Sequence, residues 1–287
     1  MKSTNTIARI ASTLMYLAVF ASASFAATNP LSYPQGLAVD AKGNLYVANS
    51  AANNILVFSP AYVLQKSETI TQNISFPTAV AFDPLGNLWV ANAEPSNGGA
   101  SGSIAEYIGG KQNTNATITA FIENPLAMTI DAIDNIWVVN NLTNILVFSS
   151  TSAYAPPAAL LQLITPTPPV YGVAIAASDV VAWGSNSGLF LGPEALPSGA
   201  IENPAAFPTL TGFALASAAG GNLYVANGDG SIDIITTTPA ADPFLKLSFV
   251  PSGMAVDKVR GRLYISNSGG NSILVYSTAG TLLHTIQ

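Results

Sequence analysis

The sequence contains no cysteine and only one histidine, His284. The absence of cysteine excludes disulfide bonds, thiolate metal sites, thiol catalysis and a lipid-modified amino-terminal cysteine. A serine–histidine–aspartate triad would depend entirely on His284, because no second histidine exists to act as its base. The composition therefore argues against a serine hydrolase.

Charge is also scarce, and positive charge most of all. Lysine and arginine together number 9, against 15 aspartates and glutamates, and the basic residues form no cluster along the chain. This balance argues against nucleic acid or an anionic membrane as the main partner. The hydrophobic share of 49% in 287 residues is enough to build one large globular domain.

Long apolar runs are absent except at the amino terminus. Lys2 and Arg9 make a basic start, residues 10–20 are largely apolar, and Ser24-Phe25-Ala26 places small residues at the two positions that a signal peptidase reads. We predict a secretory signal peptide over residues 1–26 and a secreted or periplasmic mature chain. The apolar run is shorter than the roughly 20 residues that span a bilayer, so stable membrane insertion is not expected, although a retained anchor stays open as an alternative.

The remaining chain repeats one phrase. It runs Pro34-Gln-Gly-Leu-Ala-Val-Asp40 and then Gly43-Asn-Leu-Tyr-Val-Ala-Asn49, and similar phrases follow. Six units are predicted, with starts at residues 34, 77, 125, 169, 208 and 251. A fixed period of about 40 residues is typical of a repeat architecture.

Each unit has the composition of short strands and tight turns. In the first unit we predict strands at 37–39, 45–48 and 55–58 and a fourth strand around 67–71, because β-branched and aromatic residues alternate there with glycine, asparagine and proline. Four antiparallel strands per unit indicate a propeller blade. The predicted fold is all-β, a single six-bladed β-propeller of four-stranded antiparallel blades over residues 27–287.

Two details of the repeat carry structural predictions. Asp40 ends the inner strand, and its carboxylate is expected to accept hydrogen bonds from the amides of the turn that follows. One position of the second strand is aromatic in five units and is expected to fill the space between neighbouring blades. These residues are Tyr46, Trp89, Trp137, Tyr224 and Tyr264.

The chain ends also fit a closed ring. The last unit supplies its own fourth strand over residues 281–287, and joining Gln287 to Asn29 recreates the phrase at residues 72–77. We therefore expect the two ends of the propeller to meet.

The phrase at residues 34–58 resembles the NHL repeat, and the resemblance covers residues 34–287, being strong in the first, second, third and sixth units, fair in the fifth and poor in the fourth. It implies a β-propeller of a broad group that includes gluconolactonase-like and strictosidine-synthase-like enzymes as well as pure binding modules. Fold alone does not choose among these functions.

Neutral amides are the candidate ligand-binding groups. The second strand of each well-conserved unit ends in asparagine, and these side chains, with Gln35, are expected around one mouth of the central channel. Amides donate and accept hydrogen bonds, so such a ring could hold a sugar or a peptide backbone. Because the position repeats, the favoured interpretation is that each asparagine caps its own loop. The candidates are Gln35, Asn49, Asn92, Asn140, Asn227 and Asn267.

A metal site is the less favoured alternative. Gluconolactonase-like proteins hold a divalent ion with a glutamate, an asparagine and an aspartate, and their glutamate precedes a glycine of the first inner strand, where this chain has Gln35. Since a hard cation prefers carboxylate oxygens, no cofactor is expected. Should calcium or another divalent cation bind, Asp229 and Asp233 are the weak candidates, although a glycine-rich connection between strands is the favoured interpretation of their loop.

The fourth unit is irregular. Aligning it on the first places Gly184 at the asparagine position and moves the aromatic residue two positions along, to Trp183. Because a shift of two residues preserves the face of a strand, Trp183 is expected between blades and near the channel mouth, where it could line a pocket.

The choice between a binding protein and an enzyme stays open at this stage. Lyases that resemble virginiamycin B lyase use histidine as acid or base, but His284 is predicted in the outermost strand of the last blade. The favoured hypothesis is a binding or scaffolding module for a protein, peptide or glycan, using the amide-rich face or the long loops at 93–104 and 150–168. The alternative is a metal-assisted hydrolase or lactonase of the gluconolactonase-like kind.

Overall fold

The structure is a computed structural model that describes residues 29–93, 102–149, 160–164, 169–177, 180–193, 207–236 and 241–287. Leu31–Gln287 forms one compact unit. The signal peptide predicted over residues 1–26 lies outside the described residues, as do residues 94–101 and most of 150–168. Within the described ranges, no helix is long and apolar enough to cross a membrane.

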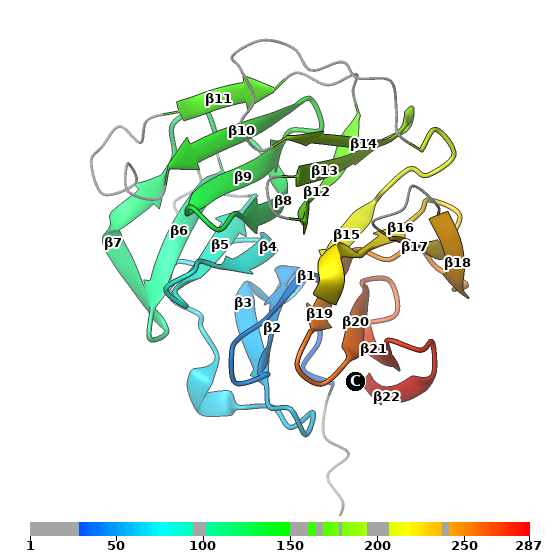
Figure 1. Cartoon of the computed structure of the whole chain (residues 1–287). Coiled ribbons are helices and arrows are strands. Elements are labelled where there is room, and N and C mark those ends of the chain that lie inside the picture. The colour runs from blue at the N-terminus through cyan, green and yellow to red at the C-terminus, as the bar shows by residue number, and fades with distance from the viewer. Residues whose placement is uncertain are drawn as a thin grey trace, which may run out of the picture. The chain divides into compact units, whose positions relative to one another are not determined.

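Leu31–Gln287 forms a six-bladed β-propeller, as predicted (Figure 1). The inner strands contact one another in a closed series, in which the last inner strand also contacts the first. Blades 1 to 3 consist of β1 (Pro34–Val39), β2 (Leu45–Asn49), β3 (Asn54–Phe58); β4 (Pro77–Phe82), β5 (Leu88–Asn92), β6 (Ser103–Ile108), β7 (Lys111–Ile118); and β8 (Pro125–Ile130), β9 (Asn135–Asn140), β10 (Asn144–Ser149), β11 (Leu160–Ile164). Blades 4 to 6 consist of β12 (Val170–Ala177), β13 (Val180–Ser185), β14 (Gly188–Pro193); β15 (Ala214–Ser217), β16 (Leu223–Ala226), β17 (Ser231–Ile235), β18 (Ala241–Lys246); and β19 (Gly253–Asp257), β20 (Arg262–Asn267), β21 (Ser272–Ser277), β22 (Leu282–Ile286).

Four blades have the four antiparallel strands that the repeat predicts, whereas the sheets of blades 1 and 4 have three described strands. In blade 1 the strand predicted around residues 67–71 is replaced by a 3-10 helix, η2 (Lys66–Glu68), and by an isolated bridge between Ile55 and Ile70. The residues of η2 are exposed and polar, so they give β3 no apolar face to pack on. Two more 3-10 turns, η1 (Ser50–Ala52) and η3 (Ala219–Gly221), lie in loops.

Strand register corrects two alignments made from the sequence. In blade 4, Val170 pairs with Ser185 as Pro34 pairs with Asn49, so Ser185 and not Gly184 occupies the asparagine position. Trp183 is therefore one residue along from the aromatic position, and it lies on the opposite face of its strand. In blade 5 the N–H of Phe213 bonds the carbonyl of Ala226 as the N–H of Ser252 bonds that of Ser266 in blade 6, so Gly212, and not Pro208, stands where blade 6 has Pro251.

The repeated aromatic position fills the spaces between blades, as predicted. Trp89 packs with β8 and β9 of the next blade, and Trp137 packs with Val173 and Trp183. Four of the five aromatic side chains are buried, while Tyr46 is half-buried. The apolar core of the propeller therefore consists of separate clusters between adjacent blades.

The aspartate that ends an inner strand organises the turn after it, as predicted. Oδ1 of Asp83 accepts from the backbone N–H groups of Leu85 (3.0 Å) and Asn87 (2.8 Å). Its Oδ2 accepts from Nδ2 of Asn87 (2.9 Å) and from Nε1 of Trp89 (3.2 Å). The residue two positions after the aspartate is left at the tip of the turn.

Serine hydroxyls join blade 6 to blade 1. Ser266 Oγ donates to the carbonyl of Gln35 (2.7 Å), and Ser268 Oγ donates to the carbonyl of Pro34 (2.5 Å). Leu31 and Ile286 belong to one apolar cluster at this seam. The two ends of the propeller meet, as the sequence predicts, and each terminal blade keeps its own strands.

Candidate functional site

Four of the predicted amides hold the loop that leads into the inner strand of their own blade. Their Oδ1 atoms accept from the backbone N–H groups of Ser32 (2.6 Å), Ser75 (3.0 Å), Glu123 (2.9 Å) and Thr211 (2.9 Å). Their exposed fractions are between 0% and 5%, so a ligand would have to displace these bonds to reach them. The amides belong to Asn49, Asn92, Asn140 and Asn227.

The other two predicted amides differ from this pattern. Asn267 is less buried, and its Oδ1 accepts from Gly270 N (3.0 Å) within its own loop. Gln35 contributes its backbone carbonyl to the seam with blade 6. None of the six amides lines the cavity at the channel mouth, so the structure does not bring them together around that cavity.

The channel mouth is small and uncharged. Its cavity has a volume of about 90 Å³, and the rings of Tyr171 and Phe213 stack at its rim with centroids 4.0 Å apart. The channel behind it, about 250 Å³, is lined by the inner strands, with side chains such as Leu37 and Met128. Sequence reasoning missed Tyr171, which occupies a β-bulge of β12 as Gln35 does in β1.

Trp183 does not line this mouth. Its side chain is fully buried and stacks on Phe190, with ring centroids 5.7 Å apart. It packs against Trp137 and Val173 between blades 3 and 4. The expectation of a pocket tryptophan is wrong, because a shift of one residue along a strand, and not two, turns the side chain to the opposite face.

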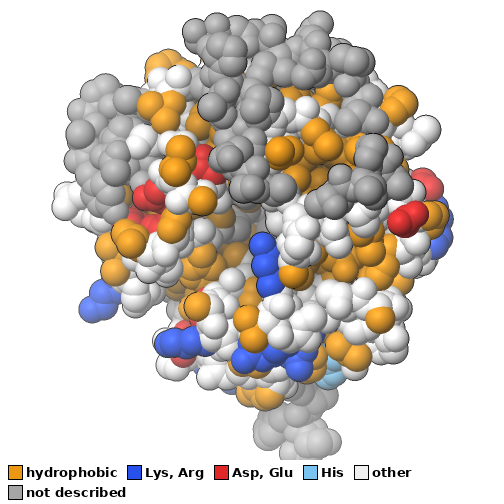
Figure 2. All heavy atoms as spheres, in the orientation of Figure 1, with side chains coloured by type: hydrophobic (Ala, Val, Ile, Leu, Met, Phe, Trp, Pro, Cys, Tyr) orange, Lys and Arg blue, Asp and Glu red, His pale blue; other side chains and the backbone are white. Residues whose placement is uncertain are grey.

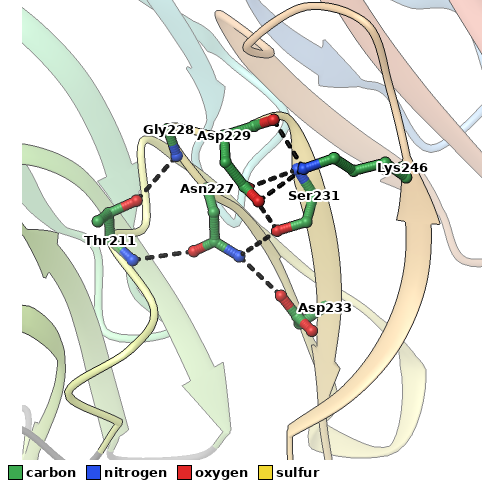
Figure 3. Close-up of polar contacts among 7 residues, drawn as sticks. All are labelled: Thr211, Asn227, Gly228, Asp229, Ser231, Asp233 and Lys246. Carbon is green, nitrogen blue, oxygen red and sulfur yellow. Dashed lines mark hydrogen bonds and ion pairs between the residues drawn. The ribbon is translucent and has the colours of Figure 1, made fainter.

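The two candidate metal ligands lie in a polar network in blade 5 (Figure 3). Asp229 Oδ2 accepts from Nζ of Lys246 (2.6 Å), and its Oδ1 accepts from Oγ and N of Ser231. Asp233 Oδ2 accepts from Nδ2 of Asn227 (2.7 Å), which also donates to Ser231 Oγ (3.1 Å). The network joins the end of β16 to β17 and β18.

The charges of this network do not favour a cation. The hydrogen bond from Lys246, followed by those from Ser231, holds the pKa of Asp229 well below its ordinary value, while burial raises the pKa of Asp233. The ammonium group of Lys246 already compensates the charge of Asp229. Among the residues that the structure describes, no three histidine or acidic side chains lie close enough to hold a metal ion. Asp229 and Asp233 therefore fit a calcium site poorly.

His284 lies in the outermost strand of blade 6, as predicted. Its ring stacks on Tyr62 of blade 1 with centroids 4.4 Å apart and an interplanar angle of 8°. The guanidinium carbon of Arg262 lies 5.0 Å from the centroid of the same tyrosine ring. These contacts place His284 in the seam between blades 6 and 1.

A much larger cavity, which sequence reasoning missed, lies between blades 1 and 2. This cleft has a volume of about 780 Å³ and is lined by the β1–β2 and β4–β5 turns, the segment 67–70 and the β6–β7 turn. Tyr46 and Phe82 form an edge-to-face pair among its apolar lining, with centroids 5.0 Å apart and an interplanar angle of 87°. Its sequence signal is the polar run Lys66-Ser67-Glu68, which falls where the fourth strand of blade 1 is predicted.

Burial and nearby charges raise the pKa values of the tyrosines in the cleft. Burial, followed by the negative charges of Asp40 and Glu68, raises the pKa of Tyr46. Burial raises the pKa of Tyr107 to about 12, and its hydroxyl donates to the carbonyls of Gln72 (3.0 Å) and Asn73 (3.1 Å). The phenol groups at this site are thus neutral at physiological pH.

Comparisons with known proteins agree with the architecture. The NHL repeat model matches residues 31–58, which form most of blade 1. No curated protein matches the chain. A solved structure described as a streptogramin B lyase has a TM-score of 0.60 and 15% sequence identity, over 91% of this chain and 84% of that one. At this level of identity the likeness shows a shared fold, so the chain is a six-bladed β-propeller with an NHL repeat in its first blade.

Proposed function

We propose that the protein is a secreted or periplasmic binding module that captures a segment of a partner protein in the cleft between blades 1 and 2. The single observation that supports this most is the cleft itself, at about 780 Å³ with the half-buried aromatic pair Tyr46 and Phe82 in its lining. Ligand sites commonly have volumes of about 300–1,000 Å³ and a mostly apolar lining with a few polar groups. The channel mouth, at about 90 Å³, is too small for a comparable ligand.

The surface around the cleft supports a protein partner. The residue two positions after the turn aspartate is strongly exposed and aliphatic in three blades: Leu85 (82%), Ile133 (76%) and Val259 (84%). The same kind of turn presents all three on one face of the propeller, and Leu85 also lines the cleft. Leu85 therefore adds to the apolar surface of the cleft, whereas Ile133 and Val259 belong to other blades, where single exposed aliphatic residues are ordinary. NHL propellers, moreover, generally mediate protein interactions.

The lactonase alternative receives no comparable support. Its metal would need carboxylates, whereas Gln35 lies outside the channel cavities, Asp229 is paired with Lys246, and Asp233 is bonded to Asn227. The lyase-type alternative would need an acid or base near a cavity, and His284 lies in an outer strand. Binding is therefore the function that we put forward.

The test is a selection for peptides that bind the full chain. A displayed library of random 12-residue peptides is panned on the immobilised protein, and the affinities of the enriched peptides are measured by calorimetry. The variant Ser67→Trp places an indole at the wall of the cleft, and Ala51→Trp is its matched control, because Ala51 is exposed in η1, away from the cleft.

We expect Ser67→Trp to weaken binding at least tenfold, whereas Ala51→Trp leaves it unchanged. Circular dichroism should give the same spectrum for both variants. Enriched peptides that bind Ser67→Trp as tightly as the parent protein would place their site elsewhere and refute the proposed function.

A further inference from the structure

We infer that the segment bound in this cleft is acidic and carries one large apolar side chain. The inference rests on the proposed function and names the chemistry of the partner. Some charged side chains of the cleft are already bonded within the protein, whereas others are not.

The two aspartates of the cleft are used within their own turns. Asp40 Oδ1 accepts from the N–H groups of Lys42 (2.9 Å) and Asn44 (2.8 Å), and its Oδ2 accepts from Asn44 Nδ2 (2.8 Å). Asp83 makes the equivalent bonds, accepts also from Trp89, and is 6% exposed. The oxygens of both carboxylates are therefore occupied by the donors of these turns.

Two lysines are among the exposed charged side chains of the cleft. Lys42 belongs to the β1–β2 turn of blade 1, and Lys111 follows the β6–β7 turn of blade 2, so the two ammonium groups come from opposite walls. Both residues are exposed, and the described part of the chain offers neither ammonium group an ion-pair partner. Glu68 is the one exposed carboxylate in the lining.

Arg260 of blade 6 also lies beside the cleft, where Asp257 already compensates its charge. Arg260 Nη2 donates to the carbonyl of Lys42 (3.0 Å), while its Nη1 bonds Asp257 (3.1 Å). Lysine and arginine side chains gather over blades 1 and 6 in the space-filling view (Figure 2). The sequence gives no sign of this group because residues 42, 111 and 260 are far apart along the chain.

These positive groups stand out on a chain whose formal net charge is −6. A partner segment that carries carboxylates is attracted to this rim, whereas a basic segment meets Lys42 and Lys111. The apolar lining needs an apolar group from the ligand to fill it, and Tyr46, Phe82 and Ile70 offer contacts suited to a leucine or aromatic side chain. This apolar requirement favours an acidic peptide over a nucleic acid.

The experiment uses three displayed libraries of equal size, each with one fixed leucine or aromatic position. Its neighbours are restricted to aspartate and glutamate, to lysine and arginine, or to neutral residues. Binding of the enriched peptides is measured on the full chain, on Lys42→Glu/Lys111→Glu, on Ser67→Trp and on Lys246→Gln, which changes a lysine remote from the cleft.

We expect the acidic library to yield the tightest binders, with affinity that falls at least tenfold from 50 to 500 mM NaCl. The double reversal should abolish this binding and favour the basic library, whereas Lys246→Gln should change nothing. If neutral or basic peptides bind most tightly and Ser67→Trp still weakens their binding, the inference fails while the proposed function stands. If no library yields a binder sensitive to Ser67→Trp, both fail. If a single-stranded oligonucleotide displaces the acidic peptides at equal affinity, a nucleic acid replaces the acidic peptide as the indicated ligand.

Discussion

Single carboxylates hold the turns of this propeller. Asp131 is 2% exposed and accepts four hydrogen bonds, including one from Nε1 of Trp137 at 3.0 Å. Asp40 accepts three and has no indole partner. We predict that Asp131→Ala lowers the free energy of unfolding by about 3 kcal/mol, because it leaves buried donors unpaired. Asp40→Ala should cost about half as much, and urea denaturation would compare the two. Equal losses would show that the indole bond adds nothing.

A second carboxylate gives a pH-dependent prediction. The bond from Lys246 lowers the pKa of Asp229, so the folded state binds the proton less readily than the unfolded state. The stabilisation is therefore fully present above the ordinary aspartate pKa, declines as pH falls below it, and is lost only below the lowered pKa of the folded state. We expect Asp229→Asn to melt below the parent protein at pH 6, by a difference that narrows steadily as pH falls to 2.5. Asp242→Asn, at an exposed position of β18, is the control. A difference that stays the same from pH 6 to pH 2.5 would contradict this account.

Some side-chain hydrogen bonds of the propeller can be predicted from the sequence, and others cannot. The turn bonds of Asp40 could be predicted because all their donors lie within four residues. The partners of the asparagine amides could not, because Asn49 bonds Ser32 and Asn92 bonds Ser75, each 17 residues earlier in the chain. The position of the amide repeats in the sequence, whereas its bonding depends on the three-dimensional course of the incoming loop.

Among the elements, the contact between blades 4 and 5 is unusually close. A Cβ added at Gly184 would lie 2.2 Å from the carbonyl oxygen of Gly212, and backbone atoms on both sides leave no room for it. We predict that Gly184→Ala lowers the free energy of unfolding by about 3 kcal/mol, or roughly 6–12 °C in melting temperature. Gly269→Ala meets no atom within 4 Å and should be nearly neutral. Equal melting temperatures for the two variants would contradict this prediction, because they would show that the backbones at Gly184 and Gly212 move apart at little cost.

Most strands could be predicted from the alternation of apolar residues between turn residues, and the exceptions have physical causes. The segment Lys66–Glu68 is too polar to pack as a strand and forms η2 instead. Blade 4 lacks the glycine and asparagine that fix the turn in other blades, so its alignment from sequence was displaced by one residue. Because of this one-residue difference, Trp183 lies between blades 3 and 4 and not at the channel mouth where it was expected.

On the scale of the whole molecule, closure depends on blades 1 and 6 meeting without exchanging a strand. We predict that a circular permutant of residues 31–287 folds when a short flexible linker joins Gln287 to Leu31 and the new ends lie between Gly109 and Gly110. Its melting temperature should be within about 5 °C of the parent, because Leu31 and Ile286 already share a cluster. New ends inside β5, between Val90 and Ala91, should prevent folding. Failure of both permutants would show that the native order of the chain is essential.

The replacement of a fourth strand in blade 1 by η2 breaks the symmetry of the ring. Six similar units would present six similar grooves, and a partner could then dock in six registers with nearly equal energy. The segment 67–70 makes the groove between blades 1 and 2 different from the others that the structure describes. An irregular repeat can thus fix a single orientation of a bound partner on a scaffold whose units would otherwise be equivalent.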